Sequence, residues 1–123
     1  MAAKILIVDD QQTMRRILRS LLSQIGFTDV HEAADGTAAL AMLKGGGFEL
    51  IVSDWNMAPM TGIDLLHHVR ADPALEALPF IMVTAESKAE NILLARQAGA
   101  STYIVKPFNA ATLREKIQAV MPS

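Results

Sequence analysis

Carboxylate, hydroxyl and ammonium groups stand at the ends of four short apolar segments that are spread along the chain. They are Asp9 and Asp10 after residues 5–8, Asp54 after residues 50–53, Thr84 at the end of residues 80–84, and Lys106 after residues 102–105. Crowded carboxylates repel one another, so a hard cation such as Mg²⁺, which prefers oxygen ligands, is expected among them. An ammonium and a hydroxyl supply the charge stabilisation that phosphoryl transfer needs, and a carboxylate can act as the nucleophile. We therefore predict that Asp54 accepts a phosphoryl group beside a Mg²⁺ site.

The segments that carry these groups are predicted to alternate between strand and helix five times. Short, continuous apolar runs are typical of strands that are buried on both faces. The predicted strands are residues 5–8, 29–33, 50–53, 80–84 and 102–105, and helices are predicted over residues 14–25, 37–44, 63–70, 87 or 88 to 98, and 110–121. This alternation predicts an α/β fold with a parallel sheet covered by helices on both faces.

The position of each strand in that sheet follows from its polarity. The three most apolar strands are expected at the centre, and the short, polar strand over residues 29–33 is expected at an edge. Parallel strands all end along one edge of the sheet, and ligands bind in the crevice outside those ends. The strand-end groups are therefore expected to converge in one crevice.

The first predicted helix is amphipathic. Thr13 is its expected N-cap, and Gly26 is expected to end it. Its apolar face is predicted to consist of Met14, Ile17, Leu18, Leu21, Leu22 and Ile25. The opposite side, which carries Arg15, Arg16 and Arg19, is expected to be solvated. The last helix is expected to begin after an N-cap at Asn109.

Composition bounds the class of protein. The chain has 123 residues, 51% of them apolar, and we expect a single domain over residues 1–123. No cysteine is present, which excludes thiolate chemistry and cysteine-ligated zinc. The net charge of −2 argues against a nucleic-acid partner, and no apolar run approaches the roughly 20 residues that span a bilayer. A cytoplasmic protein without a membrane partner is expected.

The combination of Asp9-Asp10, Asp54, Thr84-Ala85 and Lys106-Pro107 at these separations resembles a response-regulator receiver domain. The resemblance covers the whole chain, and segments 54–57 and 106–108 are similar to the single-domain chemotaxis regulators of that family. It implies a flavodoxin-like (βα)₅ doubly wound fold with strand order 2-1-3-4-5 and no output domain. It also implies a switch of a two-component system rather than an enzyme, although such a switch assists its own phosphorylation and dephosphorylation.

The resemblance assigns roles to the residues of the site. Asp54 accepts the phosphoryl group from a histidine kinase, and Lys106, which precedes a cis peptide bond to Pro107, pairs with a phosphate oxygen. Thr84 donates its hydroxyl to the phosphate. The Mg²⁺ ligands are expected to be Asp10, Asp54 and the backbone carbonyl of Asn56, with Asp9 acting through a water. Asn56 and Glu86 are expected to tune the lifetime of the phosphoryl group.

The resemblance also predicts an output surface. Tyr103 is expected to turn inward into space that Thr84 vacates, which changes the face formed by the fourth helix, the fifth strand and the fifth helix. A partner is expected to dock on that face around Tyr103, Phe108, Thr112 and Lys116. The expected partners are a chemotaxis-type histidine kinase, the flagellar motor switch or another effector, and a phosphatase.

One segment departs from the family pattern. The family has proline directly after the methionine at position 57, whereas this chain has Ala58 and then Pro59. Because proline restricts the residue before it to extended backbone, we expect a different loop path after Asn56 and a loosened or redirected start of the third helix. Gln11, which replaces a bulkier residue, is expected to leave the site more open.

Three alternative functions remain open at this point. Within the family, the chain could be a phosphate sink or a phosphorelay intermediate. A Mg²⁺-dependent phosphatase is a second class, although such enzymes carry a further aspartate where this chain has Asn56. A docking module without phosphorylation is the third, and it predicts the loss of an acceptor, metal or lysine residue that this chain retains.

Overall fold

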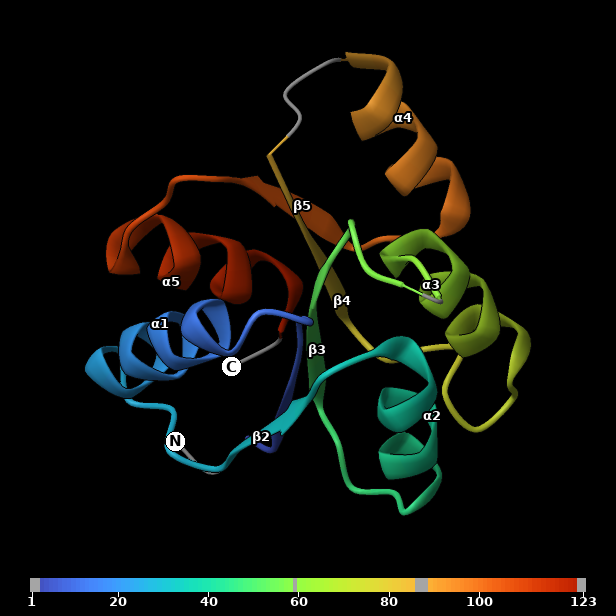
Figure 1. Ribbon diagram of the computed structural model, residues 1–123, viewed down its shortest axis with the longest axis horizontal. Coiled ribbons are helices and arrows are strands. Elements are labelled where there is room, and N and C mark those ends of the chain that lie inside the picture. The colour runs from blue at the N-terminus through green and yellow to red at the C-terminus, as the bar shows by residue number, and fades with distance from the viewer. Residues whose placement is uncertain (1–2, 59, 86–88, 122–123) are drawn as a thin grey trace.

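The computed structural model describes residues 3–58, 60–85 and 89–121. Within these residues, strands and helices alternate five times along the chain (Figure 1). The strands are β1 (Ile5–Val8), β2 (Val30–Ala33), β3 (Leu50–Asp54), β4 (Phe80–Thr84) and β5 (Thr102–Val105). The helices are α1 (Gln12–Gln24), α2 (Gly36–Lys44), α3 (Gly62–Ala71), α4 (Ala89–Ala98) and α5 (Ala110–Val120).

The strands form one parallel sheet in the order β2-β1-β3-β4-β5. Every residue of β1, β3 and β4 is buried, and these three strands are central, whereas the more polar β2 lies at an edge. The flavodoxin-like fold, the strand order and the placement of the apolar strands are therefore confirmed.

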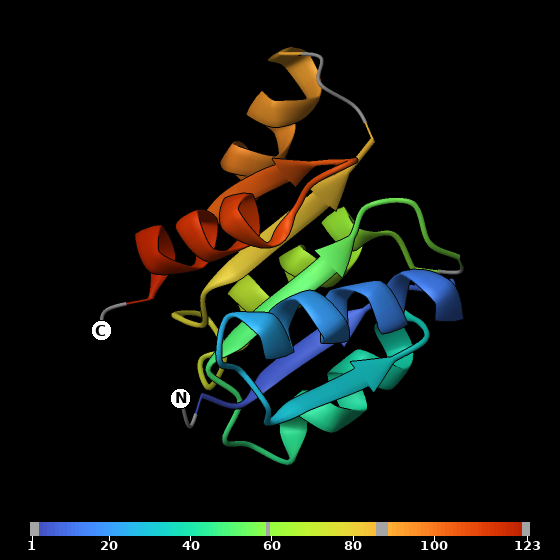
Figure 2. The same cartoon turned by 90° about the vertical axis from the view of Figure 1, so that its left-hand side faces the viewer.

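Helices cover both faces of the sheet. Figure 1 and Figure 2 show α1 and α5 against one face and α2, α3 and α4 against the other. Each face has its own hydrophobic core, because successive strand residues point to opposite sides. In β1, for example, Ile5 and Ile7 join the core under α1 and α5, while Leu6 and Val8 join the core under the other three helices.

Side-chain caps precede α2, α3 and α5. Asn109 caps α5 as predicted, its Oδ1 accepting from the backbone N–H of Thr112 at 2.9 Å. Gly26 follows the C-cap of α1 with φ +101°, a conformation that glycine adopts without a Cβ penalty. The predicted N-cap at Thr13 is wrong, because α1 begins at Gln12 and the N-cap position belongs to Gln11, without a side-chain cap.

Two predictions about the faces of α1 are also wrong. Ile17, placed on the apolar face by its spacing, is 44% exposed, because it lies at the rim of the face that Leu18 and Leu22 bury. Arg15 does not belong to a solvated side: its side chain is 16% exposed and hydrogen-bonds to Glu32 of β2, which also binds Arg19. The edge strand is close enough to α1 to supply a carboxylate to both arginines.

The start of α3 is well ordered by its own sequence. Thr61 and Asp64 form a capping box, in which each side chain accepts a hydrogen bond from the other residue's backbone N–H. The capping box stabilises this helix start, and the expected loosening or redirection by the displaced proline stays a prediction. Pro59 itself lies outside the described residues, so the altered loop path stays a prediction, as does the exact start of α4, whose predicted first residues, 87 and 88, are not described.

No helix among residues 3–58, 60–85 and 89–121 combines the length and the apolar character needed to cross a membrane.

Candidate functional site

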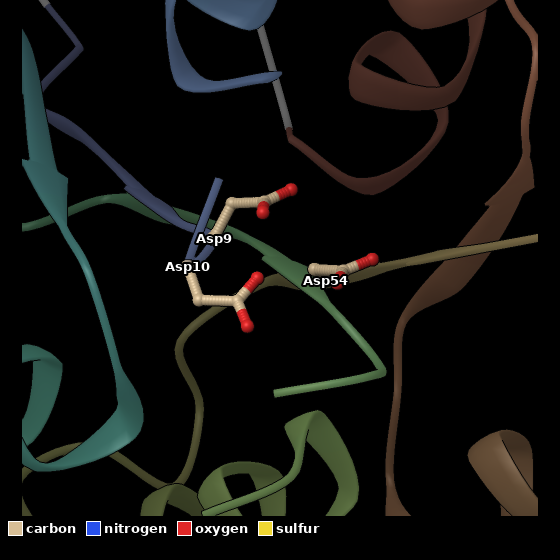
Figure 3. Close-up of side chains that lie close together, drawn as sticks. All are labelled: Asp9, Asp10 and Asp54. Carbon is tan, nitrogen blue, oxygen red and sulfur yellow. The ribbon is translucent and has the colours of Figure 1, made fainter. Parts of the chain in front are cut away.

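Three carboxylates gather where β1 and β3 end. Asp9 and Asp10 follow the last residue of β1, and Asp54 is the last residue of β3 (Figure 3). The two strands are direct neighbours, and Val8 pairs with Ser53, so their carboxyl ends lie at the same level. One carboxylate oxygen from each residue lies within 4.8 Å of the others. The predicted convergence of the acids is thus found at the edge of the sheet where it was expected.

An ammonium group closes the other side of this cluster. Lys106 Nζ lies 2.9 Å from Oδ1 of Asp54, and only 8% of the Asp54 side chain is exposed. Lys106 reaches this position because its backbone N–H continues the ladder beyond β5, donating to the carbonyl of Thr84 at 2.8 Å. The peptide bond between Lys106 and Pro107 is cis, as expected.

The hydroxyl-bearing Thr84 ends the strand next to β3. Its neighbour Val83 pairs with Asp54, which places Thr84 one residue beyond the acceptor strand on the same edge, and Thr84 is 2% exposed. Asn56 lies two residues after Asp54 in an exposed loop position. Glu86, the other predicted tuning residue, lies outside the described residues.

The residues present fit a hard divalent cation. All three candidate ligands are carboxylates, the class of ligand that Mg²⁺ prefers. Oδ2 of Asp9 is buried and has no hydrogen-bond partner among the described residues. A buried, unpartnered carboxylate oxygen is unfavourable unless a cation or water binds it. The orphaned oxygen and the neighbouring acids together make this the candidate metal site.

The same crowding perturbs the titration of Asp9. Burial raises the pKa of its carboxyl above the ordinary value of 3.8, and the charges of Asp54 and Asp10 raise it further. A hydrogen bond from the backbone N–H of Gln11 and the charge of Lys106 act in the opposite direction without cancelling the rise. Asp9 therefore holds its proton more tightly than a free carboxyl group does.

Gly62, which directly precedes the helix predicted over residues 63–70, is a further residue of this site. A Cβ at Gly62 would meet the carbonyl oxygen of Asp54 and would lie 2.9 Å from Cα of Trp55. The backbone N–H of Gly62 also donates to the carbonyl of Trp55 at 2.9 Å. The first turn of α3 therefore packs directly on the backbone that carries Asp54. The available signal was a glycine directly after the N-cap Thr61, where it costs helix stability unless something approaches closely.

The predicted output residues lie on β5, on α5 and in the segment that joins them. Tyr103 and Lys116 are close together, with the Lys116 ammonium 5.0 Å from the centre of the Tyr103 ring. Thr112 is bound to Asn109 at the start of α5. Phe108 instead packs with the core under α1 and α5, and it lines a surface groove of about 240 Å³ with Met14, Ile17, Lys106 and Pro107. The structure thus brings Tyr103 and Lys116 together and places Phe108 toward α1.

Comparisons with known proteins agree with this geometry. A sequence model of the response regulator receiver domain matches residues 5–118. The chain is similar to Chemotaxis protein CheY of Pseudomonas aeruginosa, with 58% identity over 117 residues that cover 95% of this chain and 94% of the relative. It is 57% identical to Chemotaxis protein CheY-3 of Vibrio cholerae over 117 residues, which cover 95% of this chain and 90% of that relative.

Solved structures show the same similarity. A structure of Vibrio cholerae chemotaxis protein CheY4 superposes with a TM-score of 0.91 at 36% identity, covering 98% of this chain and 100% of that one. A putative response regulator from Chloroflexus aurantiacus superposes with a TM-score of 0.92 at 28% identity and 98% coverage of both chains.

Proposed function

Because the chain belongs to the response regulator receiver domain family, we propose that it is a phosphorylation-activated switch of a two-component system in which Asp54 accepts a phosphoryl group from a histidine kinase. The observation that carries this proposal is the environment of Asp54. A nearly buried carboxylate has an ammonium at 2.9 Å on one side and two further acids on the other. Positive charge opposite a cation site is what an incoming phosphoryl group requires.

The Mg²⁺ ion would be held by Asp10, Asp54 and the backbone carbonyl of Asn56, and Asp9 would act on it through a water. Bound there, it would neutralise the acids and the oxygens of the phosphoryl group. The transfer itself takes place at Asp54 and Lys106. The phosphorus–nitrogen bond of the donor phosphohistidine breaks as a phosphorus–oxygen bond forms to Asp54, and the imidazole leaves with the electron pair. Lys106 releases the Asp54 oxygen and pairs with an oxygen of the phosphoryl group.

The new group at Asp54 then acts on the neighbouring strands. The hydroxyl of Thr84 donates to a phosphoryl oxygen. The movement of the Thr84 side chain toward that oxygen leaves space beside β5. Tyr103, whose strand pairs with β4, turns into that space. Since Tyr103 lies against Lys116 of α5, its movement changes the surface formed by α4, β5 and α5. The protein is thus a switch and not an enzyme that turns over a diffusible substrate.

Chemotaxis is the setting that the names of the relatives support. We propose that the phosphorylated protein binds the flagellar motor switch through the face around Tyr103 and Lys116, and that it acts in the cytoplasm. A phosphate sink is the second candidate within the family. The two differ in output, because a sink needs no phosphate-dependent effector binding.

A binding experiment separates these candidates. A fluorescent peptide from a flagellar motor switch protein is titrated with the protein, with and without Mg²⁺ and beryllofluoride, an analogue of the phosphoryl group. Beryllofluoride is expected to strengthen binding, and Lys116→Ala is expected to remove the gain. Lys44→Ala, an exposed lysine on α2, is the matched control and should change nothing. Equal affinity in both states would favour the sink.

A further inference from the structure

The backbone and side chain of Asp9 are held from three directions. Its N–H donates to the carbonyl of Ala33 in β2 at 3.1 Å. Its Oδ1 accepts from the backbone N–H of Gln11 at 2.9 Å. Its carbonyl oxygen accepts from Nη1 of Arg15 at 2.6 Å. Among the described residues, Oδ2 alone is left without a hydrogen bond, so every other polar group of Asp9 is used to fix the orientation of that oxygen.

The Asp9 carbonyl depends on a side chain because of its place in the fold. Asp9 lies between the end of β1 and the start of α1, so neither sheet nor helix provides its carbonyl with the usual backbone donor. The guanidinium of Arg15, one helical turn into α1, fills that role. Without it, the peptide that joins Asp9 to Asp10 could rotate, and both carboxylates would move with it.

Arg15 is itself held in place by an edge-strand carboxylate. Its Nε donates to Oε1 of Glu32 at 3.1 Å, while Arg19 donates to Oε2 of the same residue at 2.7 Å. Burial works to raise the pKa of Glu32, but the hydrogen bonds and charges of Arg19 and Arg15 outweigh it and hold that pKa below its ordinary value. Glu32 therefore ionises more readily than a free glutamate, and its carboxylate holds the Arg15 side chain in place beside Asp9.

We propose that Arg15, oriented by Glu32, is a positioning residue of the acidic site: it fixes the Asp9–Asp10 peptide so that the two carboxylates are preorganised for a divalent cation. The proposal rests on the proposed function, because it concerns the same Mg²⁺ site. It differs from a purely structural role, in which Arg15 would stabilise the contact between α1 and β2 and leave cation binding unchanged.

Arg19 provides a matched control for that distinction. It lies one turn further along α1, binds the same Glu32, and has no hydrogen bond to Asp9. Arg15 is 16% exposed and Arg19 46% exposed. If the α1–β2 ion pairs matter only for stability, removing either arginine should affect Mg²⁺ binding equally. If Arg15 positions the acids, only its removal should weaken binding strongly.

The experiment is a Mg²⁺ titration of the full chain followed by the fluorescence of Trp55, the only tryptophan and the residue next to Asp54. Arg15→Met keeps the aliphatic stem and removes the donors. It is expected to raise the dissociation constant for Mg²⁺ about tenfold, the usual effect of removing a group that orients a metal ligand. Arg19→Met is expected to stay within about twofold of the wild type, since an exposed ion pair contributes little. Arg15→Lys, which keeps one donor group, should restore part of the affinity.

The thermal midpoint without Mg²⁺ is measured on the same variants. If Arg15→Met binds Mg²⁺ as the wild type does, or if Arg19→Met weakens binding as much, the proposal is overturned. Should Arg15→Met not fold, Glu32→Gln replaces it: weaker Mg²⁺ binding than in Arg19→Met supports the proposal, and equal binding overturns it. A wild-type protein that does not respond to Mg²⁺ at all overturns the proposed function and this inference together.

Discussion

Nζ of Lys106 lies 2.9 Å from Oδ1 of Asp54, although the two residues are 52 positions apart in the chain. The contact spans β4, because Asp54 ends β3 and Lys106 follows β5, the strand on the far side of β4. It joins the one ammonium predicted for the site to the predicted acceptor.

Removing the ammonium should separate cation binding from phosphoryl transfer. Lys106→Met leaves the three acids with a larger net negative charge, so Mg²⁺ should bind at least as tightly as in the wild type. The rate of labelling by acetyl phosphate should fall about a hundredfold, the scale of losing one donor to a developing anion. Trp55 fluorescence measures Mg²⁺ binding, and mass spectrometry measures the rate of labelling. Lys44→Met serves as the control, and labelling of Lys106→Met at the wild-type rate would contradict the role given to this lysine.

Asp9 should make the stability of the protein depend on pH in a defined direction. Burial and the neighbouring acids raise the pKa of Asp9 in the folded state. The folded protein therefore binds the Asp9 proton more tightly than the unfolded chain does. The contribution of Asp9 to stability is therefore full below its ordinary pKa of 3.8 and is lost as the pH rises through the folded value.

Asp9→Asn should accordingly raise the thermal midpoint at neutral pH in the absence of Mg²⁺, while weakening Mg²⁺ binding. The gain in midpoint should shrink as the pH is lowered toward the ordinary carboxyl pKa. Thermal unfolding scans at several pH values, with and without Mg²⁺, test this. A lower midpoint for Asp9→Asn at neutral pH without Mg²⁺ would show that the carboxylate is not repelled by its neighbours.

Gly62 should tolerate no side chain. In an ordinary helix, replacing glycine by alanine stabilises the protein. Here a Cβ would meet the Asp54 carbonyl and the Trp55 backbone, so Gly62→Ala should lower the free energy of unfolding by about 1–3 kcal/mol, as overpacking does.

Gly45→Ala at the end of α2 is the control, since Gly45 has ordinary helical dihedral angles and its Cβ would contact only the carbonyl of Met42, at 3.2 Å. Urea unfolding followed by circular dichroism gives both values. Stabilisation of the Gly62→Ala variant would mean that α3 does not press on the acceptor strand.

The sequence predicted the architecture well because its signals were local. Runs such as Ile5–Val8 and Phe80–Thr84 are typical of strands buried on both faces of a covered parallel sheet, and the acids at the ends of such strands lie along one edge. The cap at Asn109 was also local, since an asparagine side chain needs only the N–H three residues later. The acid cluster and Lys106 were predictable because each of these groups stands at the end of a strand that is recognisable locally, and parallel strands end along one edge of the sheet.

The features that escaped prediction depend on approach between distant segments. Arg15 was assigned to a solvated face because helical spacing does not show that Glu32 of an edge strand lies beside it. The glycine at position 62 hinted at a close approach, but the sequence does not show that the Asp54 carbonyl is the group that approaches it. Ile17 fits the apolar spacing, yet it lies beyond the width of the face that the sheet covers. The predicted N-cap Thr13 was two residues too late, because Gln11 occupies the N-cap without a side-chain bond.

Coupling between the acceptor and the output surface can be followed at a single residue. Tyr103 is the only tyrosine of the chain, so incorporation of 3-fluorotyrosine gives one fluorine resonance. Mg²⁺ with beryllofluoride should shift that resonance in the wild type. Thr84→Val keeps the shape of the buried side chain but removes the hydroxyl, and it should bind beryllofluoride while losing most of the shift. An unchanged shift in Thr84→Val would contradict the proposed route from Asp54 through Thr84 to Tyr103.

The central claim is that Asp54 carries the phosphoryl group, and intact-protein mass spectrometry tests it most directly. The wild type is incubated with acetyl phosphate and Mg²⁺, in parallel with Asp54→Asn, which keeps the shape of the side chain but is a poor nucleophile. The wild type should gain the mass of one phosphoryl group, which hydroxylamine removes as expected of an acyl phosphate, and Asp54→Asn should gain none. A wild type that stays unmodified, or an Asp54→Asn variant that is labelled equally, would contradict the account.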